Sequence, residues 1–375
     1  MSETASLRIP SDLLPADGRF GAGPSKVRAA QLQALNDAGS TIMGTSHRQP
    51  AVRNLVGEVR EGISTLFAAP AGYEVVLGVG GSTAFWDVAS FGLVESKAQH
   101  LSFGEFGSKF AAATNKAPFL AASSIRTSEP GTRPQALAED GVDVYAWPHN
   151  ETSTGVFAPV ERVSGADSDA LMLTDATSAA GGLSVDIAET DVYYFAPQKN
   201  FASDGGLWCG LFSPAALERA ARINSSARWI PDFLNLQTAI DNSRQNQTYN
   251  TPALATLVML NEQLRWLNSQ GGLDFATGRT SDSAGRVYSW AERSAVATPF
   301  VQRPDERSNV IATIDFAADI DAAKVATVLR ANGIVDVEPY RKLGRNQLRI
   351  ATFVAIEPDD VSALLACIDH VIGAL

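Results

Sequence analysis

One lysine, Lys199, lies between two apolar segments of the chain, in YYFAPQKNFASDGGLW at residues 193–208. The segments before and after it, DVYYFA and LWCGLF, are rich in aromatic and β-branched residues, which is typical of buried strands. Burial lowers the pKa of a lysine, and the neutral amine is a nucleophile that forms a Schiff base with a carbonyl compound. The alternative is a lysine that extends its charge past the apolar surface into water, and this segment alone does not decide between the two.

Two further groups of chemically capable residues follow predicted strands. In VLGVGGSTAFWDVA a strand, a glycine-rich turn and a helix beginning near Ser82 are predicted, so the N–H groups of Gly81, Ser82 and Thr83 would face an anion. In LMLTDATSAAGG an apolar run ends at Asp175, 24 residues before Lys199. A carboxylate buried there needs a cationic or N–H partner.

Pyridoxal phosphate would make use of all three groups. Its phosphate needs a helix N-terminus, its ring nitrogen a carboxylate and its aldehyde a lysine. A glycine cluster alone is weak evidence because many tight turns contain one, and Asn150 and Thr152 in PHNETSTG are also common turn formers. Taken together, the three groups predict a pyridoxal phosphate site.

The composition excludes several other classes of protein. The chain has 375 residues, 45% of them hydrophobic, which is enough for a large core and two domains. With 30 basic and 41 acidic side chains the net charge is −11, so neither a nucleic acid nor an anionic membrane is an expected partner. No signal-like or membrane-length apolar segment is evident, so we expect a cytoplasmic protein. Cys209 and Cys367, and the four histidines, match no metal spacing, and no metal is expected.

Short apolar runs alternate with helix-length segments along most of the chain. Strands are predicted at 73–79, 99–103, 142–148, 169–176, 191–196 and 207–212, with helices at 49–70, 82–94 and 108–114. This alternation predicts an α/β fold with a mainly parallel sheet, whose ligands bind beyond the carboxyl ends of the strands.

The pattern changes after a long helical region that runs to about residue 296. A smaller α+β unit is expected there, with strands at 309–316, 334–340 and 347–353 and helices at 321–333 and 357–375. We therefore divide the chain into an N-terminal arm (1–19), a large cofactor-binding domain (20–265) and a small C-terminal domain (266–375).

At this point the sequence resembles the phosphoserine aminotransferases, which are fold-type-I, pyridoxal phosphate-dependent enzymes of the class V aminotransferase group. The resemblance covers most of the chain, in FGAGPSKV, GTSHR, HNETSTG, DATSAAGG, APQKNFASDGGLW, YNTP and RKLGRNQLRIATF. It implies transfer of the amino group between L-glutamate and 3-phosphohydroxypyruvate, giving O-phospho-L-serine and 2-oxoglutarate in serine biosynthesis. Whether the enzyme also acts in pyridoxine biosynthesis stays open.

The resemblance also implies roles for residues around the cofactor. Lys199 would carry pyridoxal phosphate as a Schiff base, Asp175 would pair with the pyridinium nitrogen, and Thr152 would hydrogen-bond the ring hydroxyl. Gln198 would contact the phosphate or the ring edge. Where the family commonly stacks a tryptophan on the ring, Phe106 is the nearest aromatic residue here, and it could equally be a core side chain.

Further residues implied by the resemblance lie elsewhere in the chain. Asn250 and Thr251 of YNTP would reach the cofactor phosphate of a neighbouring subunit, which requires a homodimer. Many family members have an arginine in the glycine-rich turn that reads GGSTAF here, so one phosphate contact is missing or replaced.

The resemblance also implies which residues bind the small-molecule substrates, glutamate and the phosphorylated 2-keto acid. His47 and Arg48 precede a helix that begins with proline and would contact the substrate phosphate or side-chain carboxylate. Arg349 would grip the α-carboxylate, which fixes the Cα–H bond for removal. The spacing within YRKLGRNQLR is longer than expected and does not decide between Arg341 and Arg345, and we choose Arg341 as a second anion contact.

Two other classes of function are compatible with parts of the pattern. Another class V transaminase, of the alanine–glyoxylate type, would share the cofactor residues but has little use for TSHR, and a cysteine desulfurase needs a loop cysteine that the chain does not offer. A nucleotide-binding α/β protein without pyridoxal phosphate would use GVGGSTAF, but it predicts no role for Lys199 and lacks an evident acidic residue for the ribose.

Overall fold

A seven-stranded sheet forms the centre of the protein in a computed structural model that describes residues 7–375. The strand order is β1-β9-β8-β7-β4-β2-β3. The strands are β1 (Glu74–Val79), β2 (Ala98–Ser102), β3 (Ser124–Thr127), β4 (Val144–Pro148), β7 (Leu171–Asp175), β8 (Val192–Phe195) and β9 (Leu207–Phe212). Strands β3, β2, β4, β7 and β8 are parallel, and β9 runs antiparallel to both β8 and β1. The predicted mainly parallel α/β sheet is therefore confirmed.

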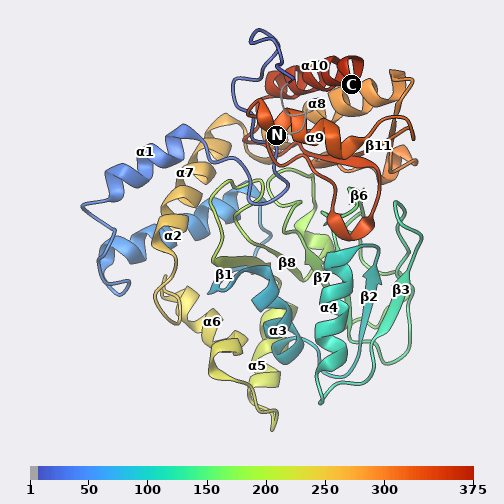
Figure 1. The fold of residues 1–375 in the computed structure, drawn as a ribbon. Coiled ribbons are helices and arrows are strands. Elements are labelled where there is room, and N and C mark those ends of the chain that lie inside the picture. The colour runs from blue at the N-terminus through green and yellow to red at the C-terminus, as the bar shows by residue number, and fades with distance from the viewer. Residues whose placement is uncertain (1–6) are drawn as a thin grey trace.

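Helices cover both faces of this sheet (Figure 1). One face packs against α3 (Gly81–Gly92), α4 (Glu105–Lys116), α5 (Pro214–Asn224) and α6 (Leu236–Arg244). The other packs against α2 (Pro50–Leu66) and α7 (Leu254–Gln270), with α1 (Ala29–Ala38) against α7. The side chains of β8 alternate between the two cores, with Tyr194 on the α3 side and Tyr193 on the α2 side, so all of its residues are buried.

A smaller unit follows α7 and packs at one end of the molecule (Figure 1). It consists of α8 (Gly272–Arg293), β10 (Ala297–Pro299), β11 (Ile311–Phe316), α9 (Ala322–Ala331), the 3₁₀ turn η5 (Arg341–Leu343), β12 (Gln347–Ala351) and α10 (Pro358–Ala374). The three strands form an antiparallel sheet in the order β10-β11-β12. This is the expected α+β pattern.

The strand predicted at 334–340 is wrong. In this segment only Val335 forms a β-bridge, to Arg19, and Asp336 has a φ of +66°, a left-handed conformation that interrupts an extended ladder. The apolar residues that suggested a strand, Ile334 and Val337, are buried in the core all the same. Helices α1, α5 and α6 and strands β3 and β10 were not predicted from the sequence.

The N-terminal segment packs against the C-terminal unit rather than against the large sheet. The backbone N–H of Ala16 donates to Asp360 on α10 at 2.8 Å, and the N–H of Val335 donates to the carbonyl of Gly18 at 2.8 Å. Residues 1–6 of the predicted arm lie outside the described residues. The division at residues 19 and 265 stays a prediction; residue 265 falls within α7.

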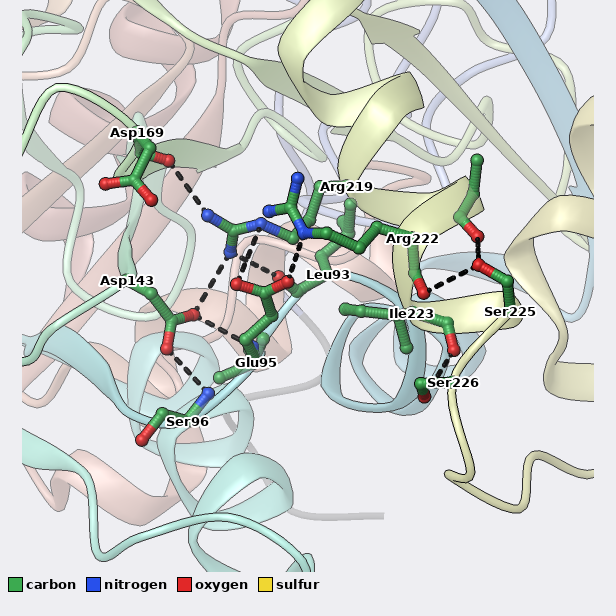
Figure 2. Close-up of polar contacts among 12 residues, drawn as sticks. Leu93, Glu95, Ser96, Asp143, Asp169, Arg219, Arg222, Ile223, Ser225 and Ser226 are labelled. Atoms are coloured by element: carbon green, nitrogen blue, oxygen red, sulfur yellow. Dashed lines mark hydrogen bonds and ion pairs between the residues drawn. The ribbon is translucent and has the colours of Figure 1, made fainter.

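A fully buried arginine, Arg219, joins several elements at the end of the sheet where β2, β4 and β7 begin (Figure 2). Arg219 on α5 donates to the carbonyl of Leu93 at 3.1 Å, to Asp143 at 3.2 Å and to the carbonyl of Asp169 at 2.9 Å. Asp143 in turn accepts from three consecutive backbone N–H groups at residues 95–97. This network fixes the starts of β2, β4 and β7, whose other ends carry the site.

Among residues 7–375, no helix is both long and apolar enough to cross a membrane. Within the same range, no group of three or more His, Cys, Asp or Glu side chains is arranged to hold a metal ion. The described part of the chain also contains two hairpin strands, β5 (Asn150–Glu151) and β6 (Val156–Phe157), and 3₁₀ turns at Ile187–Glu189, Asp232–Leu234 and Pro304–Glu306.

Candidate active site

A pocket lies at the carboxyl ends of β4, β7 and β8, where a ligand is expected in a parallel sheet. It brings together eight of the residues that the sequence singled out, namely Gly81, Ser82, Thr83, Phe106, Thr152, Asp175, Gln198 and Lys199. Sequence reasoning did not assign the remaining lining residues to the site, and these are Gly80, Trp86, Pro148, Asn150, Thr177 and Gly206. Segments more than 100 residues apart in the chain therefore form one cavity.

Lys199 follows β8 and is buried, with 8% of its surface exposed. Its Nζ donates to the carbonyl of Ala22 at 2.5 Å. Burial lowers its pKa to about 8, and the positive charge of Arg349 contributes to this, while Asp175 and Glu151 act in the opposite direction. About a tenth of the amine is therefore neutral at pH 7, far more than for an ordinary lysine, and the neutral form is the one that nucleophilic chemistry requires.

Gly23 makes room for this lysine. A Cβ at Gly23 would lie 2.0 Å from Lys199 Nζ, and its φ of +144° is one that side chains rarely adopt. The FGAGPSKV segment therefore contacts the amine of Lys199 through its backbone, with no side chain between them. The motif was noticed in the sequence, but its contact with Lys199, across 176 residues of chain, could not be read from it.

Asp175 is the last residue of β7, and its carboxylate is buried in the pocket. It accepts hydrogen bonds from Thr177 N at 2.9 Å, from Thr177 Oγ1 at 2.5 Å and from Trp86 Nε1 at 3.2 Å. Burial raises its pKa, and these hydrogen bonds partly oppose the rise. A cationic partner placed in the pocket would offset this desolvation cost.

The N-terminus of α3 closes another side of the pocket. Gly80 and Gly81 have φ angles of +107° and +74°, so the turn from β1 into the helix depends on glycine at both positions. The first N–H groups of a helix have no partner within it and favour an anion. Ser82 Oγ and Thr177 Oγ1 lie 2.6 Å apart and join this turn to the end of β7.

Asn150 and Thr152 are held by a hydroxyl that was not predicted, that of Ser178. Asn150 Nδ2 and Thr152 Oγ1 both donate to Ser178 Oγ, at 2.7 and 2.8 Å. Within the described residues, Asn150 Oδ1 and Gln198 Oε1 are buried without a hydrogen-bond partner. Buried polar atoms are rarely left unpaired, so both indicate a polar ligand in the pocket.

The residues of this pocket fit pyridoxal phosphate. The helix N-terminus at Gly81–Thr83 suits a phosphate, the buried Asp175 suits a protonated ring nitrogen, and Lys199 suits an aldehyde. The unpartnered oxygen atoms of Asn150 and Gln198 provide places for further hydrogen bonds.

Arg349 extends from β12 of the smaller unit toward the pocket residues. Its Nη1 donates to the carbonyl of Thr152 at 3.1 Å, its guanidinium lies 5.4 Å from the ring centre of Tyr340, and its Nε is buried without a partner among the described residues. Burial lowers its pKa. Arg345 is already paired with Asp315, at 2.5 Å, whereas Arg341 is exposed in η5.

Four predicted residues, His47, Arg48, Asn250 and Thr251, form a separate group and do not line the pocket. Thr251 Oγ1 and His47 Nδ1 lie 3.1 Å apart, and Arg48 contacts the side chain of Gln247 and, at 3.3 Å, the carbonyl of Tyr249. Burial and the charge of Arg48 lower the pKa of His47. The single chain thus brings His47 to Thr251, and Arg48 to the segment just before Asn250, but none of the four lines the pocket that contains Lys199.

Comparisons with known proteins identify the family to which the chain belongs. The sequence model of the family described as class V aminotransferase matches residues 20–336. A protein of Nocardioides sp. named phosphoserine aminotransferase is 64% identical over 373 residues, covering 99% of this chain and 100% of that protein. A protein of the same name from Rhodococcus jostii is 59% identical over 372 residues, again covering 99% of this chain and 100% of that protein.

The fold is also shared with a solved structure. A phosphoserine aminotransferase from Cytophaga hutchinsonii superimposes with a TM-score of 0.87 at 21% identity, over 94% of this chain and 99% of that one. With a family match over most of its length and full-length relatives at about 60% identity, the chain belongs to the phosphoserine aminotransferase family of class V aminotransferases.

Proposed function

We propose that this protein is a pyridoxal phosphate-dependent transaminase that moves an amino group between L-glutamate and 3-phosphohydroxypyruvate, in serine biosynthesis. The observation that carries the proposal is the pocket in which a buried lysine of lowered pKa and a buried carboxylate lie beside a helix N-terminus. The names of the full-length relatives support the choice of substrate.

In this proposal different residues of the pocket bind different parts of the cofactor. Lys199 binds its aldehyde, Asp175 its ring nitrogen, Thr152 its ring hydroxyl, and the N–H groups of Gly81, Ser82 and Thr83 its phosphate. Gln198 contacts the phosphate or the ring edge, and Phe106 lies against the ring. When bound, pyridoxal phosphate supplies an electron sink that makes the substrate Cα–H acidic.

The chain itself supplies the base and the grip on the substrate. With pyridoxal phosphate and substrate bound, the neutral amine of Lys199 would act as the general base that removes the proton from the substrate Cα. Arg349 binds the α-carboxylate through its guanidinium, whose free Nε has no competing partner among the described residues. That grip orients the Cα–H bond toward Nζ.

The distal end of the substrate needs a second anion site, which we assign to His47 and Arg48, with Arg341 as a further contact. Because His47 and Arg48 do not line the pocket of their own chain, we propose a homodimer in which they, with Asn250 and Thr251, complete the site of the neighbouring subunit. A cytoplasmic location is part of this proposal.

The test compares amino donors in steady-state transamination to 2-oxoglutarate. O-phospho-L-serine is expected to exceed L-serine and L-alanine in kcat/KM by at least about 100-fold, which is about 2.7 kcal/mol of discrimination. Arg48→Ala should lower kcat/KM for O-phospho-L-serine roughly tenfold or more and leave L-alanine unchanged, because only the former carries the phosphate. Arg53→Ala, on α2, serves as the matched control.

A preference for alanine with glyoxylate as acceptor would replace this proposal with the alanine–glyoxylate type of class V transaminase. The same assay with longer phosphorylated hydroxy-amino acids tests the additional role in pyridoxine biosynthesis. An equal decrease in kcat/KM for all amino donors in Arg48→Ala would contradict the assignment of Arg48 to the substrate phosphate.

A further inference from the structure

The side chain of Glu151 is fully buried directly behind the pocket, and the proposed mechanism gives it no role. Its Oε2 accepts hydrogen bonds from the backbone N–H groups of Phe106 and Gly107, both at 3.0 Å. Its Oε1 accepts from Ser153 N at 3.1 Å and from Ser153 Oγ at 2.7 Å. Four donors therefore surround one carboxylate, and no Lys, Arg or His among residues 7–375 forms an ion pair with it.

These contacts provide the cap that helix α4 lacks. The residue before the helix is Gly104, which has no side chain to accept the free N–H groups of the first turn. Ser153 Oγ accepts from Glu105 N at 3.0 Å, and Glu151 accepts from the next two residues. The first three N–H groups of α4 are thus satisfied by β5 and the turn after it, in a different part of the chain.

The close approach explains why position 104 is glycine. A Cβ there would lie 2.3 Å from Cγ of Glu151 and 2.5 Å from Oγ of Ser153. The positive end of the helix dipole also stabilises a negative charge at this place. Burial raises the pKa of Glu151, and its hydrogen bonds oppose that rise.

The cap connects two walls of the pocket. Glu151 lies between Asn150 and Thr152, both of which line the pocket. Its carboxylate accepts a hydrogen bond from the backbone N–H of Phe106, the residue of α4 that lines the same pocket. We propose that Glu151 is a positioning residue that sets the place of Phe106 against the bound cofactor. This inference rests on the proposed function, because it takes pyridoxal phosphate as the ligand.

The first test is hydrogen exchange, measured by mass spectrometry on the protein without cofactor. In Glu151→Gln the amides of residues 105–107 should exchange at least about tenfold faster than in the wild type, because the amide side chain cannot accept from all of these donors. Glu306→Gln is the matched control: it neutralises another buried carboxylate, in a different part of the chain. Unchanged exchange in Glu151→Gln would overturn the proposal.

The second test is a double-mutant cycle on the dissociation constant of pyridoxal phosphate, followed by absorbance. Glu151→Gln should weaken binding about tenfold when Phe106 is present and less than about twofold in Phe106→Ala, because its effect passes through that ring. Equal losses in the two backgrounds would show that Glu151 acts independently of Phe106 and would overturn the proposal.

A second variant covers the case in which Glu151→Gln does not fold. Gly104→Ala keeps the carboxylate but displaces it, and it should give the same exchange and binding changes. Failure of the proposed function is distinguishable, because wild-type protein would then bind no pyridoxal phosphate while the exchange of residues 105–107 still responded to Glu151.

Discussion

Trp86 Nε1 donates a hydrogen bond to Asp175 Oδ2 at 3.2 Å, so the helix after β1 holds the carboxylate at the end of β7. The same N–H lies 3.1 Å from the hydroxyl of Tyr194 on β8. Three neighbouring elements of the fold thus converge on one carboxylate of the pocket. The relationship gives Trp86 a function that its sequence position, within an apolar helix, does not indicate.

Trp86→Phe is expected to weaken pyridoxal phosphate binding roughly tenfold, because it removes a donor to a charged group while keeping an aromatic ring in the core. Absorbance titration of the cofactor-free protein measures this change. Trp229→Phe, at a residue with 76% exposure, is the control and should bind as the wild type does. Unaltered binding in Trp86→Phe would show that Asp175 needs no support from α3.

The rate at which the cofactor-free protein captures pyridoxal phosphate should depend on pH through Lys199. Its pKa of about 8 lies below the ordinary lysine value, so the amine is mostly charged below pH 8 and mostly neutral above it. Capture at subsaturating cofactor should therefore rise roughly tenfold from pH 7 to pH 9 and then level off. Stopped-flow absorbance at each pH gives the profile.

Arg349→Gln provides the matching variant for that profile. The charge of Arg349 is the second contribution, after burial, that lowers the pKa of Lys199, so its removal should move the rise in capture rate to higher pH. An unshifted profile would mean that the guanidinium is too well screened to influence the amine.

Gly23→Ala should abolish or strongly reduce cofactor capture. The added Cβ would lie 2.0 Å from Lys199 Nζ at a φ of +144°, so either the amine or the backbone has to move. Gly205→Ala is the control, since a Cβ there meets no atom within 4 Å. The comparison uses the visible spectrum after equilibration with pyridoxal phosphate, and a normal spectrum for Gly23→Ala would contradict the close approach.

Arg219→Met should lower the free energy of unfolding by about 3 kcal/mol, because it leaves Asp143 and two carbonyls at a buried junction without their cationic partner. Arg222→Met, which breaks the more exposed pair of the same helix with Glu95 at 2.6 Å, should cost less than about 1 kcal/mol. Both carboxylate networks appear in Figure 2. Urea unfolding measures the two values, and similar losses in both variants would contradict the distinction.

The sequence predicts six strands of the large sheet because each is a short apolar run followed by a recognisable turn, whereas the half-exposed strand β3 has no such run and was missed. Asp175 and Lys199 could be identified because chemically unusual residues stand at the ends of such runs. Helix α2 is also predicted, from six apolar residues at helical spacing, all of them buried in the structure. These features depend on neighbours in the chain, which a sequence displays directly.

The remaining features depend on contacts between distant segments. Gly23 and Trp86 belong to the site only because of what they meet across the fold, and Ser178 because it bonds both Asn150 and Thr152. The predicted strand at 334–340 failed for a different reason, because its apolar residues are buried but the left-handed conformation of Asp336 interrupts the pairing. Nothing in the local pattern distinguishes these cases.

The most direct test of the central claim is to reduce the purified protein with borohydride in the presence of pyridoxal phosphate and to locate the label by peptide mass spectrometry. We predict a single phosphopyridoxyl group on Lys199, and a yellow wild-type protein whose colour bleaches with L-glutamate and returns with 3-phosphohydroxypyruvate. Lys199→Ala should give neither label nor colour change. A protein that stays colourless with added pyridoxal phosphate, or that carries the label on another lysine, would contradict the account.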